Sequence, residues 1–259
     1  MNTGSHRLLD THVDALTVDD LHARIAESVQ AGTRRVFASH NLHSLYLLRE
    51  DSRLRCFYER VDYVRVDGMS IVLLGRMLGV PLRRDHRVTY VDWLPLFMAE
   101  AARVGWRVFY LGSRPGVAER AAEVLRARHP GLAIATAHGY FDTAPGSADN
   151  ERVIAAINDF RPHVLLVGMG MPRQQHWVLE NESRLAVNAI STSGAALDYV
   201  VGEIPTPPRW AGRVGLEWLF RLAAEPRRLA GRYLVEPWYV MPLLARHLVR
   251  RARTAAAGS

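Results

Sequence analysis

Short runs of β-branched and other apolar residues alternate along the chain with segments whose apolar residues recur at helical spacing. Such alternation is typical of crossover units, in which a helix connects each strand of a parallel sheet to the next. The apolar runs predict six strands, at residues 35–39, 63–67, 106–111, 133–138, 164–168 and 186–190. Helices are predicted at residues 42–50, 70–78, 91–104, 116–128, 150–160 and 172–182. We therefore expect an α/β fold, a Rossmann-like parallel sheet with helices on both faces.

The strand pattern stops near residue 205, after the proline-rich segment 204–208, and a helical C-terminal segment follows. Apolar residues recur there every four positions, at Trp210, Val214, Trp218 and Leu222, each preceded by a charged residue. This pattern predicts a basic amphipathic helix, which could cover the sheet or lie on a membrane. We divide the chain into an α/β domain, residues 1–204, and a basic C-terminal helical appendage, residues 205–259.

The charge of the chain is concentrated in this appendage. All 33 basic residues are arginine, against 26 acidic residues, for a net charge of +7. Residues 207–259 hold ten arginines and three glutamates, so the preceding residues balance at 23 charges of each sign. The basic appendage predicts contact with phosphates or an anionic membrane face, and nucleic acid is the other anion to consider.

Composition places the chain in a globular class. Its 259 residues are 49% hydrophobic and 23% charged, and a single cysteine, Cys56, excludes a disulfide framework and fits a reducing compartment. The first ten residues lack the apolar run of a signal peptide, so we expect a cytoplasmic protein. Glu236, Pro237 and Pro242 interrupt the apolar segment 234–244, which is shorter than the ~20 residues of a membrane span.

Polar residues directly follow the first two predicted strands, where ligands bind in open parallel sheets. Ser39 and Asn41 follow the first strand, either as helix caps or as ligand-binding groups. The neighbouring His40 and His43 do not indicate a metal site, because no carboxylate or cysteine is placed to complete a ligand set. Asp67 ends the second strand, where it could act as a general base or cap the following helix.

Two loops further along the chain carry groups that can bind phosphate. Arg87 and Thr89 lie in a polar loop, and arginine forks match diphosphate oxygens. Gly112 and Arg114 lie in a glycine-containing loop that opens onto a helix and favours an anion. This loop matches neither the dinucleotide fingerprint nor the Walker P-loop, so dehydrogenase and NTPase activities lack their usual marker. Tyr140, after the fourth strand, could flank a base or a sugar or simply pack.

The most distinctive stretch, residues 168–177, follows the fifth strand. Gly168 and Gly170 allow close backbone approach, and Arg173 and Gln174 offer donors to a polar ligand at the start of a helix. This combination favours ligand binding over packing. Asp198, after the sixth strand, is a second candidate carboxylate.

Taken together, these stretches resemble the WecG/TagA/CpsF family of bacterial glycosyltransferases, glycosyltransferase family 26, from about residue 34 to about residue 235. The resemblance rests on several elements in order: the Asn41 segment, Asp67-Gly68, Arg87-Val88-Thr89, residues 109–116, Gly139-Tyr140-Phe141, residues 168–174 and 215–222, Glu225-Pro226 and Arg232-Tyr233. Several such elements in the right order are far more specific than any one of them.

This resemblance implies an inverting, metal-independent and cofactor-free transfer from a UDP-sugar (N-acetylmannosamine, glucose or a related hexose). The acceptor is a sugar on undecaprenyl diphosphate, in cell-surface polysaccharide or teichoic acid synthesis. Asp67 matches the family's proposed catalytic base. The substrate-binding residues we expect are Ser39, Asn41, Arg87, Thr89, Gly112, Arg114, Tyr140, Gly168, Gly170, Arg173, Gln174 and Asp198. The chain contains no Asp-x-Asp sequence, consistent with metal-independent transfer.

The resemblance also implies that the appendage reaches the inner face of the bacterial plasma membrane and closes over the site. Arg221, Arg228 and Arg232 are the residues expected to contact the lipid diphosphate or the membrane. The expected partners are a UDP-sugar, a polyprenyl-diphosphate-linked saccharide and an anionic membrane surface. The resemblance also allows a homo-oligomer, and the sequence leaves the oligomeric state open. Nucleic acid is not expected, because the α/β domain has no interleaved basic and aromatic residues. The alternative hypothesis is a non-catalytic nucleotide-sugar or polyprenyl-phosphate binding protein.

Three positions depart from the family pattern. Gln175 replaces the usual Glu, Tyr90 stands where Gly usually follows Arg-Val-Thr, and Ser193-Gly194 replaces an expected Gly-Gly pair. We expect these differences to alter the choice of sugar without abolishing transfer.

Overall fold

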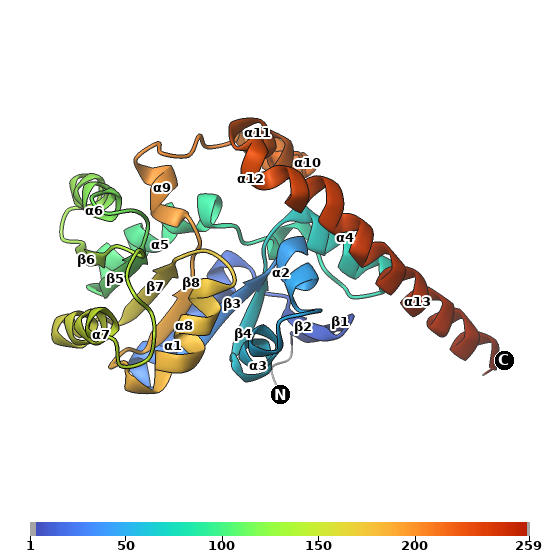
Figure 1. The fold of residues 1–259 in the computed structure, drawn as a ribbon, viewed down its shortest axis with the longest axis horizontal. Helices are drawn as coiled ribbons and strands as arrows, with labels where there is room; N and C mark the ends of the chain where they lie inside the picture. The colour runs from blue at the N-terminus through green and yellow to red at the C-terminus, as the bar shows by residue number, and fades with distance from the viewer. Residues whose placement is uncertain (1–3, 258–259) are drawn as a thin grey trace.

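Six apolar runs form one parallel sheet in the computed structural model, which describes residues 4–257 (Figure 1). The strands run in the order β4-β3-β8-β7-β5-β6 and are β3(Arg35–His40), β4(Tyr63–Val66), β5(Arg107–Gly112), β6(Ala133–Ala137), β7(Val164–Gly168) and β8(Ala189–Thr192). Five strands agree with the prediction to within one residue at each end. The α/β, Rossmann-like fold class is therefore confirmed.

The sixth strand is displaced from its predicted position at residues 186–190. Leu185 and Val187, which produced the apolar pattern, are buried but lie before the strand. Pairing with β3 and β7 begins only at Ala189. The displacement matters for the site, because it carries the polar end of β8 to Thr192.

Helices cover both faces of the sheet, because alternate residues of each strand belong to two separate apolar clusters. One cluster includes Val36, Leu165 and Ile190, and the other Phe37, Leu166 and Ala189. The first face is covered by residues of α2(Leu42–Leu47), α3(Ser52–Arg60), α4(Met69–Met77), α7(Ala148–Phe160) and α8(Arg173–Asn181). The second is covered by α1(Val18–Gln30), α5(Tyr90–Val104), α6(Val117–Arg128) and α9(Ala196–Val200). Short 3-10 turns lie at η1(Arg84–His86) and η2(Glu182–Arg184).

Several elements were not expected from the apolar pattern. They are the antiparallel hairpin β1(Ser5–Leu8) and β2(Thr11–Asp14), and helices α1, α3 and α9. Helix α1 carries a local signal, since Thr17 and Asp20 form a reciprocal capping box at its start. Asp14, at the end of the hairpin, accepts a hydrogen bond from the Val64 backbone N–H and so joins β2 to β4.

The appendage is helical, as expected, but its first apolar stripe spans two helices. Gly215 adopts a left-handed conformation (φ 80°) and ends the first of them. The helices are α10(Arg209–Val214), α11(Glu217–Ala224), α12(Pro226–Ala230), a π-helical turn η3(Gly231–Val235) and α13(Glu236–Ala257). None of the helices described is both long and apolar enough to cross a bilayer. Helix α13 packs on α2 and runs diagonally past the sheet toward the C-terminus (Figure 1).

Two glycines let the ends of β5 and β7 approach closely. Gly112 pairs with Gly168, and a Cβ atom at Gly112 would overlap the Gly168 carbonyl. A Cβ atom at Gly168 would overlap the Tyr110 hydroxyl and the Gly194 carbonyl. Both glycines are therefore needed for packing at the end of the sheet where the strands terminate.

Gly112→Ala is expected to lower the free energy of unfolding by about 2 kcal/mol or more, because the added methyl group meets rigid backbone. Gly231→Ala is the matched control, since nothing lies within 4 Å of a Cβ atom there and the residue is helical. Denaturant unfolding of the two variants measures the difference. Equal stabilities would contradict the close approach.

Candidate active site

A cavity of about 490 Å³ lies at the carboxyl ends of the strands and is closed on one side by the appendage. Parallel pairing directs every strand's carboxyl end to the same edge of the sheet, so loops far apart in the sequence meet there. The predicted site residues that line the cavity are Ser39, Asn41, Asp67, Thr89, Arg114, Tyr140, Gly168, Gly170, Arg173, Gln174, Asp198, Arg221 and Arg232. Gly112 and Arg87 lie behind its wall, and the side chain of Arg228 lies outside the described part of the structure.

Asp67 is half-buried at the end of β4 and faces this cavity. Its backbone N–H donates to the His40 carbonyl at 2.8 Å, which ties the end of β4 to β3. Its carboxylate accepts a hydrogen bond from Asn41 Nδ2 at 3.3 Å. The N-cap of α4 is Gly68, with no side-chain cap, so the capping alternative for Asp67 is wrong.

Asn41 caps a helix and also contacts Asp67, while binding of a ligand by Asn41 stays a prediction. Its Oδ1 accepts from the Ser44 backbone N–H at 3.1 Å and caps α2. Its amide nitrogen is then directed toward Asp67. Capping therefore fixes the rotamer of Asn41, and through it the position of the carboxylate.

Histidines 40 and 43 are held by protein groups. His40 is fully buried, with Nδ1 2.9 Å from Ser44 Oγ and Nε2 2.9 Å from Thr11 Oγ1. Burial lowers the pKa of His40 to about 3, so the ring is neutral at physiological pH. His43 Nδ1 lies 2.8 Å from Glu236 of α13. Among the described residues, no group of three or more His, Cys, Asp or Glu side chains could hold a metal ion.

The appendage brings charges of both signs to the side of the cavity where Asp67 lies. Arg221 and Arg232 are close enough to interact electrostatically with the Asp67 carboxylate. Glu217 also lines the cavity. Burial and the nearby charges of Asp67 and Asp92 raise the pKa of Glu217, although the Arg87 charge acts to lower it.

Arg87 connects the α/β domain to the appendage. Its guanidinium lies 3.4 Å from Glu217 and 2.8 Å from Asp92, and Nη1 donates to Thr89 Oγ1 at 3.2 Å. The residue is thus placed to hold α11 over the cavity edge. A direct contact between Arg87 and substrate stays a prediction.

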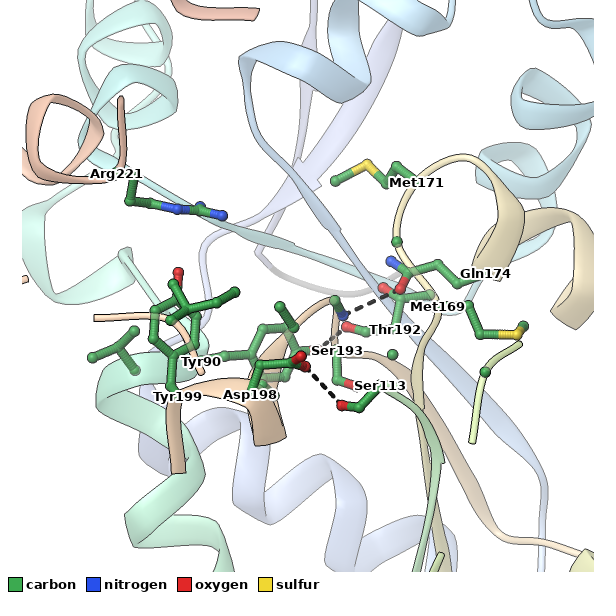
Figure 2. Close-up of a pocket in the computed structure, with 18 of the residues that line it drawn as sticks. Tyr90, Ser113, Met169, Met171, Gln174, Thr192, Ser193, Asp198, Tyr199 and Arg221 are labelled. Carbon is green, nitrogen blue, oxygen red and sulfur yellow. Dashed lines mark hydrogen bonds between the residues drawn. The ribbon is translucent and has the colours of Figure 1, made fainter. Parts of the chain in front are cut away.

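The opposite side of the cavity is built by the loops after β5, β7 and β8 (Figure 2). Ser113 Oγ donates to Asp198 at 2.7 Å, and Gln174 Oε1 accepts from the Gly194 backbone N–H at 3.1 Å. Arg173 Nη2 donates to the Phe141 carbonyl at 2.6 Å. The side chains of Ser113, Gln174 and Arg173 are therefore each held by another protein group.

The cavity residues that were not expected from the sequence include Glu217, Tyr199 and Thr192. Glu217 belongs to the segment 215–222 that supports the family resemblance, so its position carried a signal. Thr192 was hidden by the displaced strand prediction. Tyr199 lies in the short helix α9, which has no clear apolar period.

Of the three residues that depart from the expected family pattern, two line the cavity and one, Gln175, does not. Tyr90 and Ser193 line it, and the Tyr90 hydroxyl bonds to Ser191 Oγ (3.1 Å) and to the Thr192 carbonyl. Gln175 is fully buried on α8, outside the cavity lining.

Comparison with known proteins places the chain among glycosyl transferases. The model of the glycosyl transferase WecG/TagA/CpsF family matches residues 6–254. Proteins from Staphylococcus aureus strains NCTC 8325 and COL are each 24% identical over 252 residues, covering 93% of this chain and 96% of their own. Both are named N-acetylglucosaminyldiphosphoundecaprenol N-acetyl-beta-D-mannosaminyltransferase.

The buried His40 predicts a pH-dependent stability. Its folded pKa lies below the unfolded value, so on acidification the unfolded state binds the proton first and stability falls. From pH 6.5 to 5.5 this residue alone removes about 1 kcal/mol from the free energy of unfolding. His40→Asn should lack this contribution while the other histidines keep theirs. Urea unfolding of both proteins across this range measures it, and identical pH slopes would contradict the assignment.

Proposed function

The chain belongs to the WecG/TagA/CpsF family of glycosyl transferases, and we propose that it transfers a hexose from a UDP-sugar to a sugar carried on undecaprenyl diphosphate. The observation that carries the proposal is the Asp67 carboxylate, held by Asn41 inside a cavity bordered by appendage arginines. The names of the Staphylococcus relatives support an N-acetylglucosaminyl-diphosphoundecaprenol acceptor and an N-acetylmannosamine donor.

In the proposed reaction Asp67 acts as the general base. Its carboxylate accepts the proton of the acceptor hydroxyl while that oxygen attacks the anomeric carbon of the donor. The bond between the anomeric carbon and the UDP oxygen breaks in the same displacement, with inversion at the carbon. The electron pair leaves with UDP, and the proton stays on Asp67.

The leaving UDP requires groups that stabilise negative charge. The wall opposite Asp67 offers Arg114 and Arg173, with the backbone of the glycine-containing loops beside them. Preorganised donors of this kind stabilise charge that develops in a transition state. We therefore propose that transfer requires no metal ion, with cationic side chains and backbone N–H groups in its place.

The appendage is proposed to bind the acceptor. Arg221 and Arg232 are suited to the lipid diphosphate, and Arg221 Nε has no hydrogen-bond partner among the described residues. Beyond them, Trp238 is 72% exposed and Tyr239 and Met241 are also exposed. Aromatic and apolar side chains beside arginines fit the interface of an anionic membrane. We propose a peripheral position on the inner face of the plasma membrane.

Asp67→Asn should reduce the transfer rate by about 100- to 10,000-fold and leave UDP-sugar binding intact, because an amide cannot accept the proton. Release of UDP is measured in EDTA, with a short-chain polyprenyl-diphosphate sugar as acceptor. Asp159→Asn, the same change on an exposed face of α7, is the control. A wild-type protein that binds UDP-sugars but releases no UDP with any acceptor would favour the non-catalytic binding protein.

Arg221→Ala should lower kcat/KM for a diphosphate-linked acceptor by about 10- to 100-fold, because a charge-assisted contact in a half-buried site is lost. Affinity for UDP should change little. Arg246→Ala, an exposed arginine of α13 outside the cavity lining, is the matched control in assays with soluble acceptor. Loss of UDP affinity instead would assign Arg221 to the donor.

A further inference from the structure

We propose that Thr192 and Ser193 hydrogen-bond a hydroxyl group of the transferred sugar and so determine which donor the enzyme accepts. This inference rests on the proposed function, because it concerns the sugar of a UDP-sugar donor. Thr192 is the last residue of β8 and Ser193 follows it, and both residues line the cavity (Figure 2).

The two hydroxyls are buried without partners. Thr192 and Ser193 are each 1% exposed, and neither Oγ1 of Thr192 nor Oγ of Ser193 has a hydrogen-bond partner among the described residues. The neighbouring hydroxyl of Ser113, by contrast, donates to Asp198. Buried polar groups in folded proteins are nearly always paired, and leaving one unpaired costs free energy. A pair of unpaired hydroxyls at a cavity wall is therefore explained by a ligand that supplies the missing partner.

Their position corresponds to the sugar rather than to the nucleotide. Strand β8 lies between β3, on the side of the sheet where Asp67 lies, and β7, which leads to the wall formed by Arg173 and Gln174. In a single displacement the transferred sugar lies between the base, with its acceptor, and the leaving diphosphate. The end of β8 is thus beside the sugar. Figure 2 shows Thr192 and Ser193 between Arg221 and Gln174.

The backbone that carries the hydroxyls is held on several sides. The Thr192 carbonyl accepts from the Tyr90 hydroxyl and from Arg65 Nη2, the latter at 3.3 Å. The Ser193 N–H donates to the Val167 carbonyl at 2.7 Å. Arg65 is itself 1% exposed, with its guanidinium 4.0 Å from the centre of the Tyr90 ring. A rigid backbone gives the hydroxyls the fixed positions that discrimination between similar sugars needs.

A sugar hydroxyl is the group that fits this wall. Serine and threonine hydroxyls both donate and accept, as a sugar hydroxyl does. One sugar hydroxyl can therefore donate to one of the two side chains and accept from the other.

The test is a cycle of protein and substrate changes read by calorimetric binding. Wild type, Thr192→Val and Ser193→Ala are titrated with UDP, with a panel of UDP-hexoses, and with monodeoxy analogues of the UDP-hexose that binds most tightly. Each substitution should lower the affinity for that UDP-hexose by about 5- to 10-fold and leave the affinity for UDP unchanged. For wild type, one deoxy analogue should bind more weakly than the parent UDP-hexose by the same factor. For the variants, removing that sugar hydroxyl should change the affinity little.

Two controls separate this result from a folding defect. Thr192→Ser keeps a hydroxyl and should keep most of the affinity. Ser28→Ala removes another fully buried hydroxyl, on α1, and should bind every ligand as wild type does. Equal losses for UDP and UDP-hexose, or no coupling with any deoxy position, would overturn the inference alone. Wild-type protein that binds UDP but no UDP-sugar would overturn the proposed donor and this inference together.

Discussion

Parallel pairing of all six strands is the constraint on which the site depends. It requires apolar residues on both faces of every strand and sends each carboxyl end to one edge of the sheet. Polar residues separated by more than a hundred positions, such as Asp67 and Gln174, can then line one cavity. The close approach of β5 to β7 at Gly112 and Gly168 belongs to the same constraint, because a side chain there would separate the strands.

A second layer of order comes from short local motifs at those strand ends. The cap of α2 by Asn41 is an ordinary solution to the unpaired N–H groups of a helix start. Here the same side chain has an amide nitrogen left over, and this group reaches Asp67. A residue needed to begin a helix therefore also orients the proposed base, so neither function can be changed without affecting the other.

The sequence predicted the fold class, five strand positions and thirteen of the residues that line the cavity, because these follow from apolar periodicity and from residues after strands. It did not predict α1, α3 or the hairpin, whose local signals are short. Arg87 shows a further limit: its residue type indicated phosphate, but its partners, Asp92 and Glu217, are decided by how α11 packs. The division at residue 204 stays a prediction. The appendage is nevertheless in close contact with the rest, through His43 and Glu236 and through Val240 and Leu244 in the apolar cluster.

Two of the residues that depart from the expected family pattern, Tyr90 and Ser193, lie at the cavity but apart from the contact between Asp67 and Asn41. Asp67 and Asn41 lie at the ends of β4 and β3, and their mutual contact involves none of the altered positions. Tyr90 and Ser193 alter instead the wall at the end of β8, where the Tyr90 hydroxyl holds the Thr192 carbonyl over the buried Arg65. If Thr192 and Ser193 bind the sugar as proposed, a change there alters the sugar-binding groups and leaves the contact between Asp67 and Asn41 in place. In the proposed reaction, donor choice would therefore depend on the end of β8, and proton transfer on the ends of β3 and β4.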